Sequence, residues 1–176
     1  MLAASVYMIV FRIVHIAAGV AWGGSVFLFV VFVQPSAAAV GPASGPFMDE
    51  LLEKRRLVDW ILRLAGFTIA GGLFLYWHDW QAAGSLGDWV GTRFGLALTI
   101  GSVLAIAGFL IGVFGTKPGV DELLALGRKA KESGGAPPPE LAAQIQQLRL
   151  RLRLLARTNL AFITLAVLAM ATARYW

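Results

Sequence analysis

One face of the first apolar segment carries side chains suited to hold a cofactor. Its residues recur at intervals of three and four, which places them on one side of a helix: Arg12, His15, Gly19, Trp22 and Val26. His15 lies about nine residues, or about 14 Å, inside the segment, too deep for its ring to reach water. A neutral imidazole at that depth requires a hydrogen-bond partner or a metal ion.

This face suits haem b, whose iron takes a histidine and whose flat ring carries two propionates at one edge. His15 would be the axial ligand, Gly19 would leave room for the ring, and Trp22 would pack below it. Arg12, together with Arg93 at the start of the third apolar segment, would pair with the propionates. The alternative is a structural histidine, hydrogen-bonded to a serine, threonine or carbonyl oxygen of a neighbouring helix.

The second histidine ends the second apolar segment, within Trp77-His78-Asp79-Trp80. In an antiparallel helix pair it would lie level with about residue 8, about 10 Å from His15. Joint ligation of one metal by both histidines is therefore the less favoured arrangement. We interpret His78 as an interfacial residue among aromatic side chains, with a copper or proton-entry site as the alternative.

The elements that must position these residues are four long apolar segments. Of 176 residues, 58% are hydrophobic and 14% are charged, against about 45–50% and about 25% in soluble domains. Four segments can cross the roughly 30 Å hydrocarbon layer as helices: residues 6–33, 57–80, 89–115 and 157–175. The sequence predicts an all-α integral membrane four-helix bundle, one transmembrane domain over residues 1–176.

The connecting segments are predicted to extend the helices beyond the membrane. Residues 118–156 predict a cytoplasmic helical hairpin, broken at residues 133–139, whose second helix continues to the C-terminus. Residues 44–46 predict the start of a helix that continues into the second span. The hairpin carries an apolar stripe: Leu148, Leu152 and Leu155. We expect a solvated hairpin beside lipid headgroups or, alternatively, a docking surface.

Charges and aromatic residues predict the orientation. Basic residues gather at 54–56 and 117–153, whereas the loop between the second and third segments carries Asp79 and Asp88 before Arg93. Because cytoplasmic loops are rich in Lys and Arg, we predict a bacterial inner-membrane protein with both termini outside. Aromatic residues mark the outer boundary: Tyr76, Trp77, Trp80, Trp89, Tyr175 and Trp176.

Several other residues in the spans have structural interpretations. Arg63 is expected to pair with Asp59 one turn earlier, and Arg157 and Asn159 to lie at the inner boundary of the fourth span. Small residues four apart predict close helix packing: Gly19 and Gly23, Gly66 and Ala70, Gly91 and Gly95, Gly108 and Gly112.

The first segment also resembles known families. Val14-His15-Ile16, Trp22-Gly23-Gly24 and a run ending in Pro35 resemble the first helix of CopD-like copper-resistance proteins and are similar to that of HemJ-type protoporphyrinogen oxidases. Most of the chain looks like an uncharacterised bacterial branch of four-span proteins related to both. The further matching stretches are Pro35, Val40-Gly41-Pro42, Phe47-Met48 and Leu73-Phe74-Leu75-Tyr76-Trp77.

The HemJ-type resemblance implies a b-type haem held by His15. That family also has a functional lysine in a later span, and no predicted span here contains lysine, which counts against porphyrinogen oxidase activity. The CopD-like resemblance implies periplasmic copper handling, with Met1, Met8 and His78 as outer candidates.

We therefore predict a haem b-binding membrane protein with a redox or haem-handling role. The alternatives are a non-catalytic accessory subunit of a larger respiratory or photosynthetic complex, and CopD-like copper import or resistance. The chain has no cysteine and no nucleotide-binding loop, and its basic residues flank a membrane and not nucleic acid. Membrane lipid is the expected partner, with other membrane subunits or a second copy of the chain as further candidates. Enzymatic turnover is left open.

Overall fold

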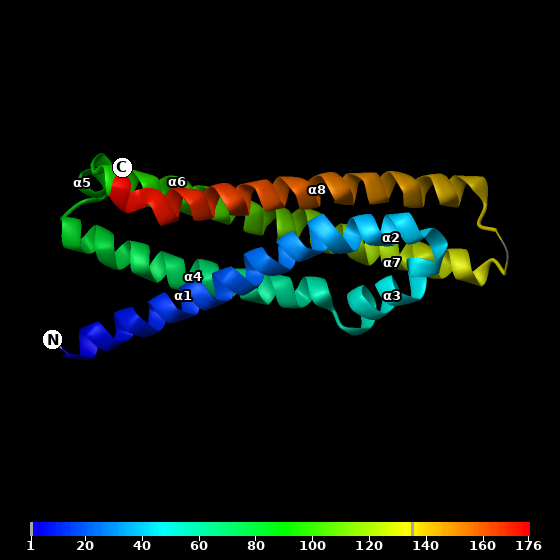
Figure 1. Cartoon of the computed structure of the whole chain (residues 1–176), viewed down its shortest axis with the longest axis horizontal. Coiled ribbons are helices and arrows are strands. Elements are labelled where there is room, and N and C mark those ends of the chain that lie inside the picture. Colours follow the sequence, from blue (N-terminus) through cyan, green and yellow to red (C-terminus); the bar gives the residue numbers. More distant parts are fainter. Residues whose placement is uncertain (1, 135) are drawn as a thin grey trace.

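The structure of this protein, a computed structural model, describes residues 2–134 and 136–176. These residues form helices joined by short turns, and none of them lies in a strand (Figure 1). Four helical stretches are long and apolar enough to cross a membrane: Val6–Lys54, Leu57–Ala83, Arg93–Glu132 and Pro139–Tyr175. The all-helical architecture and the four apolar helices confirm the sequence-based expectation at that level.

The first stretch is a long helix whose winding changes before a proline. α1 (Leu2–Leu28) passes through the π-helical turn η1 (Phe29–Val33) into α2 (Gln34–Val40). Pro35 lies in the first turn of α2, where it lacks an N–H and its ring crowds the preceding turn. A wider π turn accommodates that disruption, so the helix continues beyond residue 33, where the predicted span ends.

The chain then reverses and breaks once before the second long helix. η2 (Gly41–Ser44), α3 (Gly45–Asp49) and η3 (Glu50–Lys54) lead back towards α4 (Leu57–Ala83). The predicted helix from residues 44–46 does not continue into α4, because Arg56 adopts a left-handed conformation with φ 52°. A left-handed residue cannot continue a right-handed helix, so η3 and α4 are separate elements.

The turn after α4 contains a short helix that the sequence analysis did not predict. α5 (Leu86–Gly91) begins at Ser85, whose side chain accepts from the Asp88 N–H. α6 (Arg93–Ile111) begins at Thr92, whose side chain accepts from the Gly95 N–H. Because each N-cap fixes a separate helix start, the predicted start of the third span at residue 89 is wrong.

The last two long helices form a hairpin that extends far beyond the turn at α5. α6 passes through η4 (Gly112–Thr116) into α7 (Lys117–Glu132), and this stretch has 40 residues. At 1.5 Å per residue it is about 60 Å long, twice the hydrocarbon thickness. α8 (Pro139–Thr172) returns without a break and ends in η5 (Ala173–Tyr175), which confirms the predicted continuous helix. Both termini lie at the end opposite the hairpin tip (Figure 1).

The helices pack as two close pairs, α1 with α4 and α6 with α8. A core cluster joins the pairs in the half of the bundle that carries the termini: Trp22, Val26, Ala65, Ala105, Ile163 and Ala166. A second cluster lies in the hairpin, where Val120 of α7 packs against Leu148 and Leu152 of α8. Part of the apolar stripe predicted as a candidate docking surface is therefore buried inside the hairpin.

Glycines allow the backbones of α6 and α8 to approach closely. A Cβ on Gly101 would lie 2.7 Å from Cγ of Met170 and 3.1 Å from the Ala166 carbonyl oxygen, and one on Gly108 would lie 2.9 Å from Oδ1 of Asn159. The other predicted small-residue pairs differ. Gly19 and Gly23 also face neighbouring helices, whereas no described atom outside the local backbone lies within 4 Å of the Cβ position at Gly66 or Gly91.

Candidate functional site

His15 lies in the contact between α1 and α4. Its Nδ1 lies 2.8 Å from the main-chain carbonyl oxygen of Thr68, and since a carbonyl can only accept, Nδ1 carries the proton and donates. The ring fills the space above Gly72, where a Cβ would lie 2.8 Å from Cε1 and 2.9 Å from Nδ1. The imidazole is therefore half-buried and oriented by α4, with Nε2 as its remaining nitrogen.

The other residues predicted to surround a haem have different surroundings. A Cβ on Gly19 would lie 3.4 Å from Cγ2 of Thr68, so the side of α1 beside Gly19 is filled by α4. Trp22 is 3% exposed and belongs to the core cluster. Arg12 and Arg93 are exposed, and neither makes an ion pair with another described residue. Only His15 thus has the geometry of a ligand here.

His78 lies apart from His15. The stacking of Phe11 on Phe74, with ring centroids 3.8 Å apart, fixes the antiparallel register of α1 and α4. That register puts His78 level with about residue 8, about 10 Å along the helices from His15. His78 is exposed, with Nδ1 3.5 Å from Oδ1 of Asp79. Met1, a candidate copper ligand, lies outside the described residues.

Within residues 2–134 and 136–176, no three His, Cys, Asp or Glu residues come together as a metal site. A haem needs only one protein ligand, and the donated Nδ1–H of His15 is the arrangement in which Nε2 can bind a metal. The ring position fits an axial ligand. The packed surface at Gly19 does not provide the room that the haem prediction assigned to it.

The large cavity of the molecule lies elsewhere, between the α2–α3 segment and the α7–α8 hairpin. Its volume is about 790 Å³, and it is lined from Trp22 and Ala65 at one end to Ala142 at the other. Along α8 the lining runs from residue 142 to residue 159, about 25 Å. Cavities of about 300–1,000 Å³ are typical of small-molecule sites, so this volume can hold one elongated ligand.

Two polar atoms on the wall of this cavity lack a partner. Oδ1 of Asn159 and Oγ1 of Thr116 are buried without a hydrogen bond to any described residue. Asn159 is 7% exposed, and its amide fits against Gly108 and Gly112 of the facing helix. A buried polar group without a partner costs about 1–3 kcal/mol, so the two residues are positioned to bind a molecule in the cavity.

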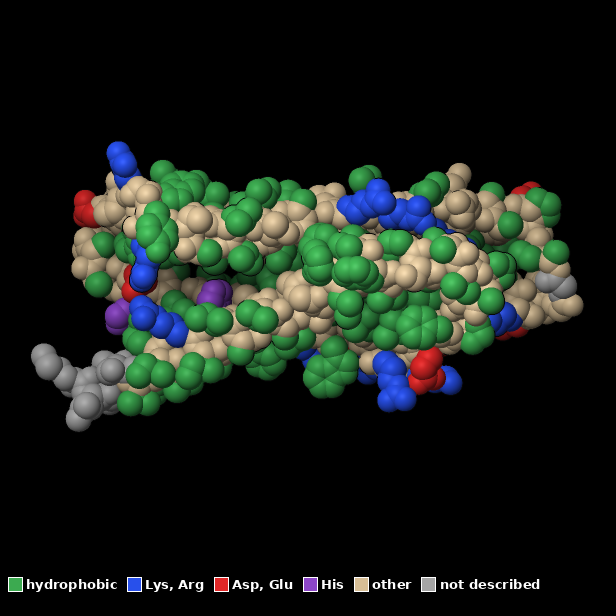
Figure 2. Space-filling view, in the orientation of Figure 1, with side chains coloured by type: hydrophobic (Ala, Val, Ile, Leu, Met, Phe, Trp, Pro, Cys, Tyr) green, Lys and Arg blue, Asp and Glu red, His purple; other side chains and the backbone are tan. Residues whose placement is uncertain are grey.

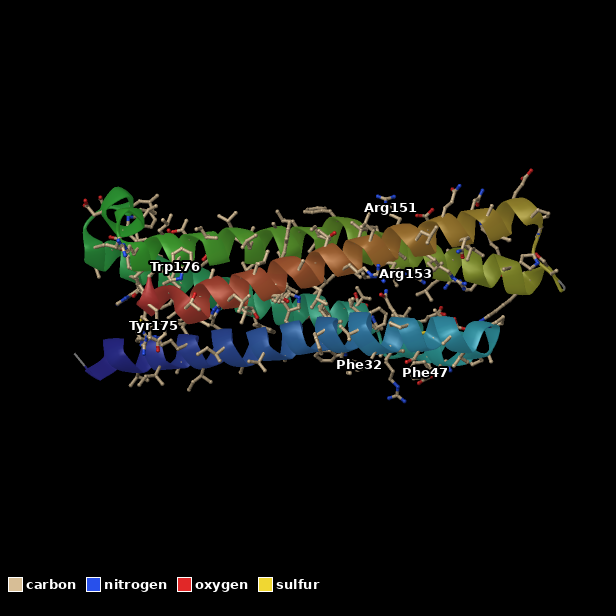
Figure 3. All side chains as sticks on the ribbon, turned by 45° about the horizontal axis from the view of Figure 1, so that its top comes forward. Phe32, Phe47, Arg151, Arg153, Tyr175 and Trp176 are labelled. Carbon is tan, nitrogen blue, oxygen red and sulfur yellow. The ribbon has the colours of Figure 1, made fainter. Side chains whose placement is uncertain are left out.

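Two arginines of α8 line the cavity nearer the hairpin tip. Arg149 and Arg153 are exposed, and neither pairs with an acidic side chain in the part of the chain that the structure describes. Figure 3 shows Arg153 on the side of α8 that faces α2 and Arg151 on the opposite side. Basic side chains gather over α8 in this half of the molecule, beside a hydrophobic band (Figure 2).

Acidic residues neutralise the basic residues on the other side of the cavity. Lys131 of α7 pairs with Asp49 of α3, and both line the cavity. Nearby, Nη1 of Arg128 lies 2.8 Å from Oε1 of Glu53. Net positive charge at the cavity therefore comes from Arg149 and Arg153.

Sequence analysis assigned Asn159 a boundary role and did not select Thr116. One signal could have found the first: Asn159 is the only asparagine of the chain, and it lies inside an apolar span. A different prediction, an ion pair between Asp59 and Arg63, is wrong. The Arg63 guanidinium lies 4.9 Å from the Trp60 ring centroid, while Asp59 pairs with Arg56 at 3.0 Å.

Comparisons with known proteins add no assignment. No protein-family model matches this chain, no curated protein is similar to it, and no solved structure matches its fold. The resemblance to CopD-like and HemJ-type proteins stays a prediction from the residues that carry it.

Proposed function

We propose that this chain is a membrane protein that binds one amphiphile in the cavity between the α2–α3 segment and the α7–α8 hairpin. The observation that supports this function is the partnerless amide of Asn159, 7% exposed, on the wall of a largely apolar cavity. A packed bundle without a ligand gains nothing from an unpaired amide at such a position.

The position of the cavity along the spans favours a ligand drawn from the bilayer. Trp22 and Ala65 lie in the middle of the first and second predicted spans, whereas Asn159 lies near the end of the fourth. With both termini outside a bacterial inner membrane, the deep end lies at hydrocarbon level and the arginines lie at the cytoplasmic surface. An apolar body and an anionic head would match these two environments.

The lining residues favour binding over catalysis. Among the described residues that line the cavity there is no histidine, and the one carboxylate, Asp49, is engaged by Lys131. Such a lining offers no side chain suited to act as a general acid or base. We therefore assign the cavity a holding or transfer role.

The test is to purify the full chain in mild detergent, extract it with organic solvent and identify what is released by mass spectrometry. Gly127→Phe should reduce the released amphiphile at least about tenfold, because Gly127 lines the cavity and no described atom lies within 4 Å of its Cβ position. Gly24→Phe is the matched control, since its Cβ position is equally open and it is not part of the lining. Equal amounts from both variants would refute the proposal.

Haem b binding at His15 is the second candidate, favoured by the hydrogen bond from Nδ1 to Thr68. A haem there would supply redox chemistry, and His15 would hold its iron through Nε2. The measurement is the visible absorption of the purified protein after expression with sufficient haem. A Soret band lost in His15→Ala supports this candidate, and a colourless wild-type protein removes it.

A further inference from the structure

We infer that the ligand of this cavity is an anionic diacyl phospholipid, held by its phosphate at Arg149 and Arg153 and by its ester groups at Asn159 and Thr116. This inference rests on the proposed function and names the ligand class. It follows from the order of the polar groups along α8 and from the charges around them.

The polar groups are spaced as a phospholipid requires. Arg153 precedes Asn159 by six residues and Arg149 precedes it by ten, which corresponds to about 9 Å and about 15 Å along the helix. A long arginine side chain spans part of the first distance. A phosphate at Arg153 therefore leaves the ester groups, a few bonds deeper, at the level of Asn159.

Asn159 and Thr116 can both donate to an ester carbonyl. An amide offers N–H groups and a hydroxyl offers O–H, and each residue has a buried oxygen without a partner among the described residues. Thr116 lies one turn after Gly112, the glycine whose Cβ position is 4.0 Å from Nδ2 of Asn159. The two groups therefore approach the cavity from facing helices, at neighbouring levels.

The charge pattern favours an anionic head. Three cations of α7 are matched with acidic side chains, Lys117 with Asp121, Arg128 with Glu53, and Lys131 with Asp49. Arg149 and Arg153 line the cavity without such a match among the described residues. Arginine binds phosphate oxygens through its planar fork of donors, and two adjacent arginines on one helix face supply two such forks.

The length of the cavity suits one acyl chain. Its lining extends about 25 Å along α8, and about half of that length lies beyond the arginines towards the hairpin tip. The deep end, at Trp22, Val26 and Ala65, is apolar. One leaflet of a bilayer is about 15 Å thick, so a chain that enters beside Asn159 reaches the level of Trp22 without leaving its own leaflet.

The first experiment measures headgroup preference. The full chain is exchanged into mixtures of phosphatidylglycerol and phosphatidylcholine with identical chains, and bound lipid is counted by native mass spectrometry. We expect one lipid per chain and a preference for phosphatidylglycerol of about tenfold, equivalent to about 1.4 kcal/mol. The Arg149→Gln/Arg153→Gln double variant should lose this preference, and Arg151→Gln should keep it, because Arg151 is on the opposite side of α8 (Figure 3).

The second experiment tests the ester contacts. Phosphatidylglycerol with two ester linkages is compared with its diether analogue, which lacks the carbonyl oxygens. The wild-type chain should prefer the diester, and Asn159→Leu and Thr116→Val should each reduce that preference several-fold. The headgroup preference of these two variants should be unchanged, which shows that they are folded.

The outcomes separate the ligand class from the proposed function. Equal binding of both headgroups by the wild-type chain, or a headgroup preference that survives in the double variant, overturns the phospholipid assignment. Release of another amphiphile from the cavity in place of phospholipid overturns it as well but leaves the proposed function intact. An equal loss of lipid from Gly127→Phe and Gly24→Phe overturns both.

Discussion

Single glycines decide where polar side chains are tolerated inside this bundle. Gly72 leaves the space that the His15 ring occupies, and Gly108 leaves the space for Oδ1 of Asn159. The two polar groups then differ. His15 is hydrogen-bonded to the backbone of α4, whereas Oδ1 of Asn159 has no partner among the described residues. A satisfied group stabilises its helix contact, and an unsatisfied one is available for a ligand.

Replacing Gly72 tests the first of these spaces. Gly72→Ala should lower the free energy of unfolding by about 1–3 kcal/mol, because its Cβ overlaps the His15 ring and overpacks the contact. Gly66→Ala on the same helix should leave stability unchanged or raise it by up to about 1 kcal/mol, since that position is open. Thermal unfolding in detergent, followed by circular dichroism, compares the two. Equal stabilities would show that the His15 ring is not packed on α4 as described.

Asn159→Leu should separate stability from binding. Leucine fills a similar volume and removes the unpaired amide, so the ligand-free protein should be more stable by about 1–3 kcal/mol. The same change should weaken lipid binding. The measurement is the unfolding midpoint of delipidated protein together with the amount of lipid retained before delipidation. A less stable Asn159→Leu protein would mean that the amide already has a partner within the bundle.

At the scale of elements, ion pairs join α3 and η3 to α7 and thereby form one side of the cavity. The break at Arg56 separates η3 from α4, so that Glu53 can reach Arg128 and Asp49 can reach Lys131. These side chains are largely exposed, and such pairs contribute about 0–1 kcal/mol each. They therefore orient the α3 segment more than they stabilise the fold.

Cross-linking tests this arrangement directly, because the chain has no cysteine of its own. The double variant Asp49→Cys/Lys131→Cys should form a disulfide rapidly under mild oxidation, since these side chains meet. Asp49→Cys/Lys129→Cys is the control, because Lys129 lies two residues away on the same helix and so on a different face. Mobility on a non-reducing gel reports the result. Similar yields from the two pairs would contradict the placement of α3 on α7.

At the scale of the whole molecule, the helices are too long for one bilayer. The α6–α7 stretch has 40 residues and measures about 60 Å, so about half of it projects beyond the roughly 30 Å hydrocarbon layer. The apolar ends of the bundle lie on the side of the termini, and the charged ends lie in the hairpin. This length places the proposed cavity across the membrane boundary.

The orientation is tested with single cysteines at the two ends. Ser133→Cys in the hairpin turn should react with a membrane-impermeant maleimide only in inside-out vesicles, and Ser85→Cys between α4 and α5 only in intact cells or spheroplasts. Lys and Arg enrichment in the hairpin gives this direction. Labelling of both positions from the same side would be inconsistent with four spans.

The architecture was predictable because it depends on local composition and length. Four apolar stretches longer than 18 residues exclude a soluble fold, and the uninterrupted helix from Pro139 follows from the absence of a breaker. The helix ends were less predictable. Arg56, in a left-handed conformation, and Thr92, as an N-cap, interrupt helices at positions where hydrophobicity does not change. Their conformations depend on how neighbouring helices must turn to pack.

By itself, the sequence determined that the chain is helical and apolar over four long stretches, that its charges collect at one end, and that His15 must find a partner. Only the tertiary structure decided which partner, because the Thr68 carbonyl and the space at Gly72 come from a helix more than 50 residues away along the chain. The same holds for Asn159, whose burial against Gly108 depends on how α6 and α8 pack. Burial and hydrogen bonding are properties of pairs of distant segments, and a single segment does not contain them.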